Sequence, residues 1–258
     1  MSNWEYKDFT DAILQLTSID LASYNERQMK RRINSFMSRN KYQNYHDFYQ
    51  AVVIDKEIRN KFINFITINV TEFFRNPAQW DKLKIDIIPK WTELRQPMKI
   101  WSSACSTGEE PYSLVMLLNQ FMDLDSIKVL ATDIDDGAIA KAQQGVYTSK
   151  NLKNIPDEYI FKYFDYKDDE YYIKDRVKKC VEFKKLNLLA DPYPQRCHLI
   201  LCRNVMIYFT MDVKEQMYKR FYDSLLPGGV LFLGNTEQII SPGQYGLTSL
   251  KSFFYSKA

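Results

Sequence analysis

A loop with two adjacent carboxylates is the part of this sequence whose chemistry is best defined. Residues 100–113, IWSSACSTGEEPYS, contain a short apolar stretch, then Gly108, Glu109 and Glu110, and then Pro111. A phosphate-binding loop needs several glycines and bare backbone N–H groups, and two carboxylates here would repel a pyrophosphate. They suit a ligand that has cationic groups and no phosphate, and S-adenosylmethionine, with its sulfonium and ammonium, is such a ligand. The alternative is that both acids only complement the dipole of a following helix.

A third acid follows at a related position. Asp133 comes directly after the apolar run 127–132 (IKVLAT), about 24 residues beyond the loop, and in dinucleotide-binding folds an acid at the tip of the second strand holds the ribose hydroxyls. A strand-end aspartate can also act as the N-cap of the next helix, which the sequence predicts at 136–144. The pairing with the first loop favours the ribose role.

Alternating strands and helices would have to position these acids. Short apolar runs predict buried strands, and leucines at helical spacing predict the helix after Pro111. The predicted elements are the strands 99–103, 127–132, 183–189, 197–202 and 230–233, the helices 112–122, 136–144 and 212–226, and a closing hairpin-like pair at 247–250 and 253–256. Pro227-Gly228-Gly229 predicts a turn before the fifth strand. The result is an open α/β sheet, which binds ligands at the carboxyl ends of its strands.

Residues 147–181 interrupt this alternation. The segment is rich in Tyr, Lys and Asp, and its pattern predicts a hairpin of 171–173 with 177–183. We interpret it as an inserted antiparallel subdomain, about 147–182. Further along, Asp191-Pro192-Tyr193-Pro194 resembles the signature of amino-group methyltransferases. It precedes the fourth predicted strand instead of following it, so we interpret it as a turn.

Residues 1–70 contain no glycine and no proline, and their apolar residues recur at helical spacing in four segments. This pattern predicts a small helical bundle, and residues 80–94 predict an amphipathic linker helix after it. The second helix carries mostly basic charge. Arg27, Lys30 and Arg31 lie opposite its apolar stripe, so they form either an ordinary solvated face or a docking face for an acidic partner.

The composition is that of an ordinary globular protein. The 258 residues are 45% hydrophobic, with a net charge of +3, which is too small to indicate general nucleic-acid affinity. The four cysteines form no CxxC pair and indicate buried free thiols in a reducing compartment, and two distant histidines do not make a metal site. The N-terminus has no apolar signal region and no run approaches a membrane span of about 20 residues, so we expect a cytoplasmic protein.

Six motifs occur in an order that is specific to one family. They are NVTEFFR at 69–75, WSSACSTGEEPYS at 101–113, ATDID at 131–135, LNLL at 186–189, CRNVMIYF at 202–209, and PGG with LGNTE around 227–237. Together they resemble the chemotaxis-receptor protein-glutamate O-methyltransferases, the CheR family. The resemblance implies a Rossmann-like class I S-adenosylmethionine-dependent methyltransferase sheet in residues 97–258 with an inserted antiparallel β-subdomain. It also implies an N-terminal helical receptor-docking domain in 1–75 and a linker helix in 76–96.

The same resemblance implies S-adenosylmethionine as the cofactor and methyl transfer to receptor glutamates. The residues that match the family's cofactor-binding positions are Asn69, Thr71, Arg75, Glu109, Glu110, Asp133, Asn187, Leu188, Arg203 and Asn204. One of the two adjacent glutamates would contact the methionyl part, Asp133 the ribose, and Asn187-Leu188 the adenine.

Arg75 and Tyr208 are the residues that the resemblance places at the transferred methyl group. A glutamate side chain in water has a pKa of about 4.3, so its carboxylate is already a nucleophile at pH 7 and the reaction requires no general base. Arg75 would hold the charge of this carboxylate, and Tyr208 would hydrogen-bond it, pack on the sulfonium, or only pack in the core. The expected partner is the helical cytoplasmic region of chemotaxis receptors, which a monomeric enzyme would meet through the basic face of its second helix.

One departure from the family concerns the insertion. Some members grip a receptor's C-terminal peptide with this subdomain, using glycines in a hairpin loop, whereas residues 148–186 contain no glycine. Two other functions stay open. The first is a methyltransferase that acts on nucleic acid through the Arg-rich helix, and the second is a non-catalytic adaptor that senses S-adenosylmethionine.

Overall fold

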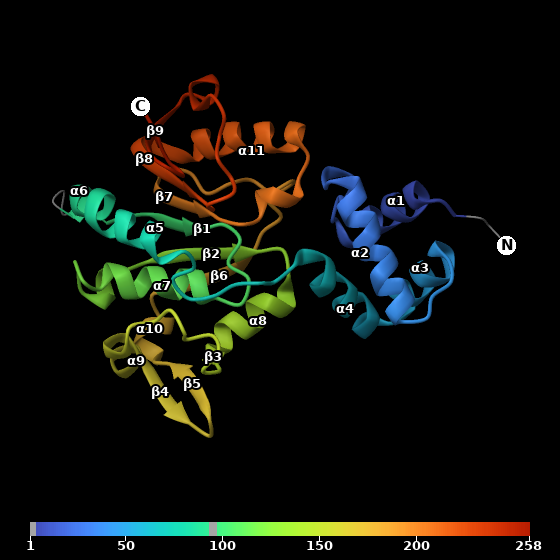
Figure 1. The fold of residues 1–258 in the computed structure, drawn as a ribbon, viewed down its shortest axis with the longest axis horizontal. Helices are drawn as coiled ribbons and strands as arrows, with labels where there is room; N and C mark the ends of the chain where they lie inside the picture. Colours follow the sequence, from blue (N-terminus) through green and yellow to red (C-terminus); the bar gives the residue numbers. More distant parts are fainter. Residues whose placement is uncertain (1–3, 93–96) are drawn as a thin grey trace. The chain divides into compact units, whose positions relative to one another are not determined.

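The computed structural model describes residues 4–92 and 97–258 of the chain (Figure 1). The chain divides into two compact units, which we call the helical unit and the sheet unit. The helical unit consists of Met1–Asn69 and Val205–Met217, and the sheet unit consists of Val70–Asn204 and Tyr218–Ala258. Helix α11 (Met211–Ser224), predicted at 212–226, supplies residues to both units.

Four α-helices form most of the helical unit, as the spacing of its apolar residues predicts. They are α1 (Tyr6–Thr17), α2 (Glu26–Arg39), α3 (Tyr45–Ile54) and α4 (Lys56–Thr67), accompanied by the 3-10 turns η1 (Leu21–Ser23) and η4 (Met206–Tyr208). An Asn or Asp side chain caps α2, α3 and α4 by accepting a backbone N–H of the first turn. The core is aromatic, because Phe9, Phe48 and Phe62 are fully buried with ring centroids between 5.0 and 6.0 Å apart.

A seven-stranded sheet in the order β6-β2-β1-β7-β8-β10-β9 organises the sheet unit. Its strands are β1 (Ile100–Ser102), β2 (Val129–Asp133), β6 (Val181–Lys185), β7 (Cys197–Cys202), β8 (Leu225–Leu233), β9 (Leu247–Lys251) and β10 (Phe254–Lys257). The first five strands in this order run parallel, and β10 runs antiparallel to β8 and β9. The predicted open α/β sheet with an antiparallel closing pair is therefore confirmed. The carboxyl ends of β2, β1, β7 and β8 lie along one edge.

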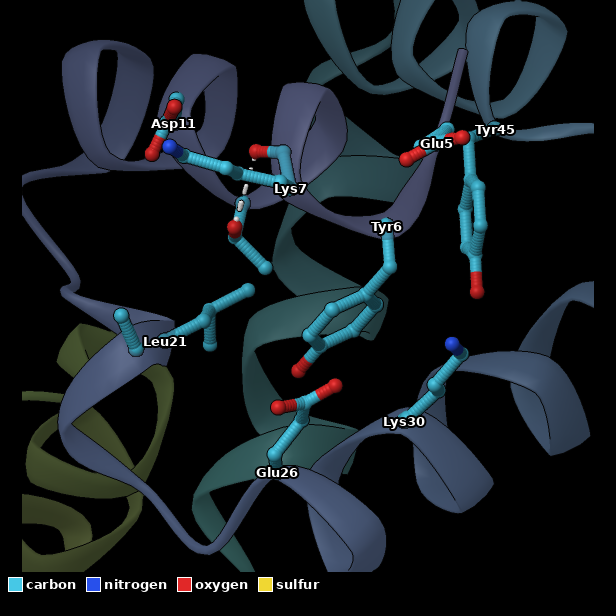
Figure 2. Close-up of a pocket in the computed structure, with 10 residues that line it drawn as sticks. Glu5, Tyr6, Lys7, Asp11, Leu21, Glu26, Lys30 and Tyr45 are labelled. Atoms are coloured by element: carbon cyan, nitrogen blue, oxygen red, sulfur yellow. Dashed lines mark hydrogen bonds between the residues drawn. The ribbon is translucent and has the colours of Figure 1, made fainter.

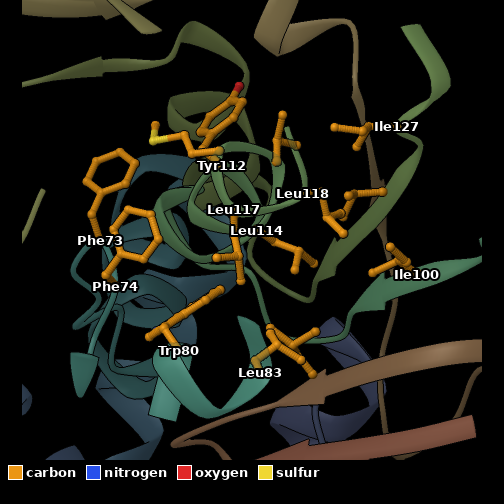
Figure 3. Packing of buried hydrophobic residues seen from close by; sticks show 14 of the residues in the cluster. Phe73, Phe74, Trp80, Leu83, Ile100, Tyr112, Leu114, Leu117, Leu118 and Ile127 are labelled. Carbon is orange, nitrogen blue, oxygen red and sulfur yellow. The ribbon is translucent and has the colours of Figure 1, made fainter. Parts of the chain in front are cut away.

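Helix α7 (Glu109–Leu118) lies at the centre of the main core. Every residue of this helix is buried, and it contacts β2 and β6 of the sheet. Figure 3 shows Phe73, Phe74 and Trp80, which come from the chain before β1, in the same cluster as the leucines of α7. Because α7 is buried on all sides, its two N-terminal carboxylates are carried into the interior with it.

The inserted subdomain is antiparallel as predicted, but its hairpin pairs different residues. Strands β3 (Val146–Tyr147), β4 (Phe164–Lys167) and β5 (Glu170–Ile173) form a three-stranded sheet in the order β3-β5-β4, and α9 (Asp157–Tyr163) precedes β4. The predicted pairing of 171–173 with 177–183 is wrong, because α10 (Asp175–Lys178) follows β5 and β6 pairs in parallel with β2. In β6, apolar Val181 and Phe183 alternate with polar residues, a pattern that fits an edge strand of either sheet.

The turn between β4 and β5 is built without glycine. Asp168 and Asp169 have φ angles of 51° and 61°, and a two-residue hairpin turn of type I′ needs positive φ at both positions. The Tyr166 hydroxyl donates to Asp169 Oδ1 at 2.8 Å and supports this turn. In Figure 1 the yellow hairpin extends away from the main sheet.

Several predicted boundaries differ from the structure, and strand β6 (Val181–Lys185) lies earlier than the predicted 183–189, whose end forms a turn. Helix α7 begins and ends three to four residues earlier than 112–122, because its first turn starts directly after Gly108. Strand β8 already begins at Leu225 and includes the predicted turn, where Gly228 has a φ of 75° and the register against β7 shifts. The linker helix is broken into α5 (Pro77–Lys82), a π-helical turn η2 (Leu83–Ile87) and α6 (Ile88–Thr92), and its predicted end at Leu94 lies outside the described residues.

All four cysteines are buried and free, as their apolar surroundings predict. Burial raises the pKa of Cys105 and Cys202 well above the ordinary thiol value, so both stay protonated near neutral pH. Within residues 4–92 and 97–258, no helix is both long and apolar enough to cross a membrane.

Candidate functional site

The loop that joins β1 to α7, which we call the cofactor loop (residues 103–108), lies at the carboxyl edge of the sheet. The Cys105 N–H donates to Thr132 O of β2 at 2.9 Å and anchors the loop to that strand. Gly108 has a φ of 97°, and a Cβ there would lie 2.9 Å from Ala142 Cβ and 2.9 Å from Tyr147 Oη. The single glycine is therefore required both by its conformation and by close packing.

Asp133 lies at the tip of β2 beside this loop. Its carboxylate accepts the Ser106 N–H at 2.7 Å and the Asp135 N–H at 3.0 Å. Burial raises its pKa to about 6, although these hydrogen bonds oppose the shift. Helix α8 (Asp136–Gln144) matches the predicted helix, but its N-cap is Asp135, whose side chain accepts two backbone N–H groups of the first turn. The capping alternative for Asp133 is therefore wrong, and its ribose role stays a prediction.

Glu109 and Glu110 are buried, and each has partners from other elements. Thr107 Oγ1 donates to Glu109 Oε2 at 2.7 Å, and Asn151 Nδ2 donates to Glu109 Oε1 at 3.2 Å. Ser102 Oγ donates to Glu110 Oε1 at 2.8 Å. Burial raises the pKa of both carboxyls. Side-chain donors from outside α7 thus hold both carboxylates, which complementing the helix dipole alone would not require.

Arg203 follows β7, and its buried guanidinium contacts residues from several other elements. Its Nη1 lies 3.5 Å from Glu110 Oε2, and its Nη2 donates to Arg75 O at 2.6 Å and to Gln79 Oε1 at 3.1 Å. Its guanidinium also stacks 4.7 Å from the centroid of the Phe232 ring. The side chain is 2% exposed. Arg203 thus links the first turn of α7 to the segment that carries Arg75.

That segment, residues 70–75, we call the arm. Phe74 has a φ of 48°, and its N–H donates to Ser113 Oγ of α7 at 2.9 Å. The Arg75 carbonyl accepts the Trp80 indole N–H at 3.1 Å in addition to the Arg203 guanidinium. Arg75 Nη1 donates to Val70 O at 2.9 Å. The backbone of Arg75 is therefore fixed by other elements, while its side chain is held by a carbonyl of the arm itself.

Asn204 and Glu237 join the tips of β7 and β8. Glu237 Oε2 accepts the Asn204 N–H at 2.6 Å and the Gly234 N–H at 2.8 Å, and a Cβ at Gly234 would lie within van der Waals overlap of this oxygen. Asn204 has a φ of 60°, and its Oδ1 is buried without a hydrogen-bond partner among the described residues. This role of Glu237, in the motif LGNTE, does not follow from the sequence, since no local pattern shows which N–H groups a carboxylate accepts.

The turn after β6 lies next to Asp133. The Leu186 N–H donates to the Asp133 carbonyl at 2.9 Å. Asn187 Oδ1 accepts the Leu189 N–H at 2.9 Å, and the Leu188 carbonyl accepts the Tyr193 hydroxyl at 2.8 Å. The structure thus brings Asn187 and Leu188 close to the acid predicted to hold the ribose. Tyr193, from the proline-rich turn, is a buried structural residue here.

Two of the predicted cofactor and catalytic residues belong to the helical unit. Asn69 Nδ2 donates to Thr67 Oγ1 at 3.2 Å, and the Tyr208 carbonyl, in η4, accepts the Asn25 N–H at 2.8 Å. The other predicted cofactor and catalytic residues, including the half-buried Thr71 of the arm, belong to the sheet unit. Within that unit the structure gathers the acids, Arg203, Asn204 and the arm around the carboxyl edge.

Two protein-family models match this chain along most of its length. The description "CheR methyltransferase, SAM binding domain" matches residues 69–253, and "CheR methyltransferase, all-alpha domain" matches residues 4–67. The chain belongs to the CheR methyltransferase family. S-adenosylmethionine is therefore its cofactor, as the acids of the loop and the resemblance predict.

Curated relatives agree with this family over nearly the whole chain. A chemotaxis protein methyltransferase of Listeria monocytogenes is 41% identical over 98% of this chain and 97% of its own length. Relatives of the same name from Borreliella burgdorferi and Vibrio cholerae are 32% and 31% identical, over 86% and 93% of this chain and 83% and 87% of their own lengths.

The residues at the carboxyl edge fit the cofactor of the family. Asn204 Oδ1 is a buried acceptor without a partner among the described residues, and S-adenosylmethionine carries donors in its ammonium and its ribose hydroxyls. Asp133, Glu109 and Glu110 add three carboxylates, which favour the positive charges of that molecule. Over the described part of the chain, no cluster of three or more His, Cys, Asp or Glu side chains could hold a metal ion.

The basic face of α2 is exposed, as the helical pattern predicts. Arg27, Lys30 and Arg31 are exposed, whereas the apolar stripe on the opposite side is buried. Lys30 also lines a cavity of about 710 Å³ between α1, η1, α2 and α3, which the sequence did not predict. Figure 2 shows the Tyr6 hydroxyl of this cavity pointing toward Glu26. Burial raises the pKa of Tyr6 to about 12, and the nearby Glu26 charge adds to the shift.

Proposed function

We propose that this protein transfers the methyl group of S-adenosylmethionine to glutamate side chains of chemotaxis receptors and forms methyl esters. The observation that carries the proposal is the 41% identity, over 98% of the chain, to a protein named chemotaxis protein methyltransferase. The bound cofactor supplies a methyl group on a sulfonium, which a carboxylate can attack. Because a glutamate side chain is ionised at pH 7, the chain needs no general base for this reaction.

Arg75 is the residue that we assign to the substrate carboxylate. A guanidinium presents a planar pair of N–H donors that matches a carboxylate. The arm supports this role, because Ser113, Trp80 and Arg203 fix the backbone on both sides of Arg75 while its side chain stays half-exposed. Tyr208 is assigned to the same step, either as a hydrogen-bond donor or as a ring that packs on the sulfonium.

The remaining predicted site residues are assigned to the cofactor. Asp133 takes the ribose, one of the two glutamates takes the methionyl part, and Asn187-Leu188 flank the adenine. Asn69, Thr71 and Asn204 complete the set. Arg203 contributes by holding the arm and Glu110 in place, which agrees with its buried contacts.

The helical domain is assigned to receptor docking. Receptors of this class expose acidic residues on long helices, and the exposed face formed by Arg27, Lys30 and Arg31 complements such a surface. We assign docking to residues 1–75, the linker to 76–96 and catalysis to 97–258, in a cytoplasmic, monomeric enzyme. The β4–β5 turn is made of two aspartates instead of glycines, which supports receptor recognition without capture of a C-terminal peptide.

Methyl transfer to receptor-containing membranes tests this function. With cofactor radiolabelled at the methyl group, we expect label in the receptor band and its release as methanol under mild alkali, which hydrolyses esters but not methylamines. Label that resists alkali, or label found in added RNA or DNA instead of receptor, would refute the proposal. Binding of cofactor without any transfer would identify a sensor instead of an enzyme.

A further inference from the structure

The start of the inserted subdomain contacts both parts of the proposed site. We call residues 147–154 the entry segment, because they lead from α8 and β3 into the insertion. Tyr147 and Asn151 contact the cofactor loop and the first residue of α7. Lys153 and Asn154 contact the arm. Every one of these contacts lies within the sheet unit.

Tyr147 holds the cofactor loop at its tightest point. Its hydroxyl donates to the Thr107 carbonyl at 2.7 Å and fills the space that a Cβ at Gly108 would need. Its ring packs edge-on against Phe73 of the arm, with centroids 4.8 Å apart. Burial raises its pKa well above the ordinary phenol value, so the hydroxyl remains a donor at every pH at which the protein works.

Asn151 orients Glu109. Its Oδ1 accepts both the N–H and the hydroxyl of Thr148, at 3.1 and 2.9 Å, which fixes the rotation of the amide. The Nδ2 is thereby directed at Glu109 Oε1. Since Thr107 takes the other oxygen, the carboxylate is held by one donor from the loop and one from the insertion. No sequence motif predicts this role for Asn151.

The tie to the arm is made by the next two polar residues. Asn154 Nδ2 donates to the Phe73 carbonyl at 3.3 Å, and Lys153 Nζ lies 2.8 Å from Glu72 Oε2. The lysine side chain is 63% exposed, so this ion pair contributes little. The backbone bond of Asn154 and the Phe73–Tyr147 ring contact are the stronger links, and they place the arm and the loop against the same short segment.

We propose that the entry segment belongs to the cofactor site, with Tyr147 and Asn151 as positioning residues for the loop and for the Glu109 carboxylate. This inference rests on the proposed role of the paired glutamates in cofactor binding. The contacts of Tyr147 and Asn151 connect the inserted subdomain to the cofactor loop, so a displacement of the insertion changes cofactor affinity. The outer part of the insertion, beyond residue 154, contacts the arm through the Phe164–Phe73 and Tyr159–Phe74 ring pairs.

The sharpest variant is Asn151→Asp. It keeps the oxygen that closes the Thr148 turn but replaces the donor to Glu109 by a second carboxylate oxygen. We expect calorimetry to show that S-adenosylhomocysteine, the product left when the cofactor has given up its methyl group, binds at least about tenfold more weakly than to wild type at pH 8, because a second carboxylate facing Glu109 repels it. At pH 6 a proton shared between the two carboxylates restores a hydrogen bond, so the ratio of mutant to wild-type affinity should recover. Asp133 and Glu110 titrate in wild type and variant alike, so their effect cancels in the ratio, and Cys105 and Tyr147 have raised pKa values.

A conservative pair of variants separates positioning from folding. Tyr147→Phe removes one hydroxyl and should weaken binding about threefold to tenfold, the worth of one hydrogen bond. Tyr166→Phe is the matched control, because it removes an exposed hydroxyl bonded to Asp169 in the same subdomain and should leave affinity unchanged. Thermal unfolding of each unliganded variant reports any loss of stability.

Two results overturn the proposal. One is wild-type affinity at pH 8 in Tyr147→Phe, which decides the matter even if Asn151→Asp fails to fold. The other is a weakened Asn151→Asp whose affinity ratio does not recover at pH 6. A wild-type protein that binds S-adenosylhomocysteine but methylates no receptor refutes the substrate assignment alone, because every readout here is cofactor affinity.

Discussion

The cofactor loop region and helix α2 use charge in opposite ways. Glu109, Glu110 and Asp133 are at most 8% exposed, and each accepts hydrogen bonds from other elements. On α2, Arg27 and Arg31 are exposed to solvent. The energy of a buried charge depends on a few fixed partners, whereas an exposed charge acts through a field that salt screens within about 8–10 Å.

This difference separates two kinds of specificity in one chain. Substitutions around the loop should alter stability or cofactor affinity at any ionic strength, because water cannot replace a missing partner there. Substitutions on α2 should change neither stability nor cofactor affinity. They should change only the binding of a partner, and mainly at low salt.

The largest effect is expected from a buried arginine. Arg203→Met leaves the Glu110 carboxylate, the Arg75 carbonyl and the Gln79 side chain without their common donor. Loss of one partner of a buried pair costs about 3–5 kcal/mol, which urea denaturation should show as a lower free energy of unfolding. Arg27→Met is the control, and its unfolding curve should match wild type. Equal curves for both variants would contradict the distinction between buried and exposed charge.

Arg75→Ala tests the fixed arm. Arg75 is assigned to position the substrate carboxylate, and a misplaced reacting group can lower the rate by about 10²-fold. Arg75→Lys should recover only part of this loss, because a point charge cannot replace the planar fork. Steady-state rates at saturating cofactor and receptor give kcat directly. A wild-type kcat in Arg75→Ala would remove this residue from the chemical step.

Asp133 should make cofactor affinity depend on pH. Its pKa is raised to about 6 by burial, and the ionised form is the stronger acceptor for ribose hydroxyls. Affinity for S-adenosylhomocysteine should therefore rise as the pH increases from 5 to 7, by up to about tenfold per unit below pH 6. Asp133→Ala should bind about 1–3 kcal/mol more weakly at pH 7 and lose this pH dependence. A slope that persists in the variant would assign the titration to another group.

The pH dependence of stability distinguishes the effect of Asp133 on cofactor affinity from its effect on folding. Because the pKa of Asp133 is higher in the folded state than in the unfolded chain, its contribution to stability is present below about pH 4 and is lost as the pH rises through 6. Stability from this group and cofactor affinity thus change in opposite directions. Thermal unfolding of the unliganded protein, measured across the same pH range in wild type and Asp133→Ala, checks the sign.

Local patterns in the sequence are sufficient to predict most of the helices and strands that position the site. The α8 prediction agrees with the observed helix because a capping aspartate precedes it and a left-handed glycine ends it. The buried strands follow from continuous apolar runs. The sequence does not predict which strand β6 pairs with, because the alternation of Val181 and Phe183 fits either the seven-stranded or the three-stranded sheet. Its parallel pairing with β2 is seen only in the structure.

The environment of the acids depends on residues that are distant in sequence. Glu109 and Glu110 look like exposed first-turn residues, and only the burial of the whole of α7 makes them interior carboxylates. The close packing at Gly108 comes from Ala142 and Tyr147, and one partner of Glu237 is the N–H of Asn204, which follows β7. No periodicity predicts such contacts, although the resemblance to a family names several of the residues that make them.

The smallest effect on the isolated protein is expected on α2. Arg27→Glu with Arg31→Glu should leave unfolding and S-adenosylhomocysteine affinity unchanged, because both side chains are exposed to solvent. The control is Lys56→Glu with Lys61→Glu, which makes the same change of net charge on α4. Comparing the two double variants shows whether an effect comes from the position of the charges on α2 or only from the change of net charge.

The same double variant should be distinguished when receptor is added. Complementary charge mainly raises the rate of encounter and sets the register of the two surfaces, so the KM for receptor should rise severalfold at low ionic strength. The variant should also lose most of the salt dependence that wild type shows, since screening then has little attraction left to weaken. The control on α4 should keep both the KM and the salt dependence of wild type. If the α2 variant instead methylates receptor with a normal KM at low salt, the basic face is an ordinary solvated surface, and the two regions differ in burial but not in function.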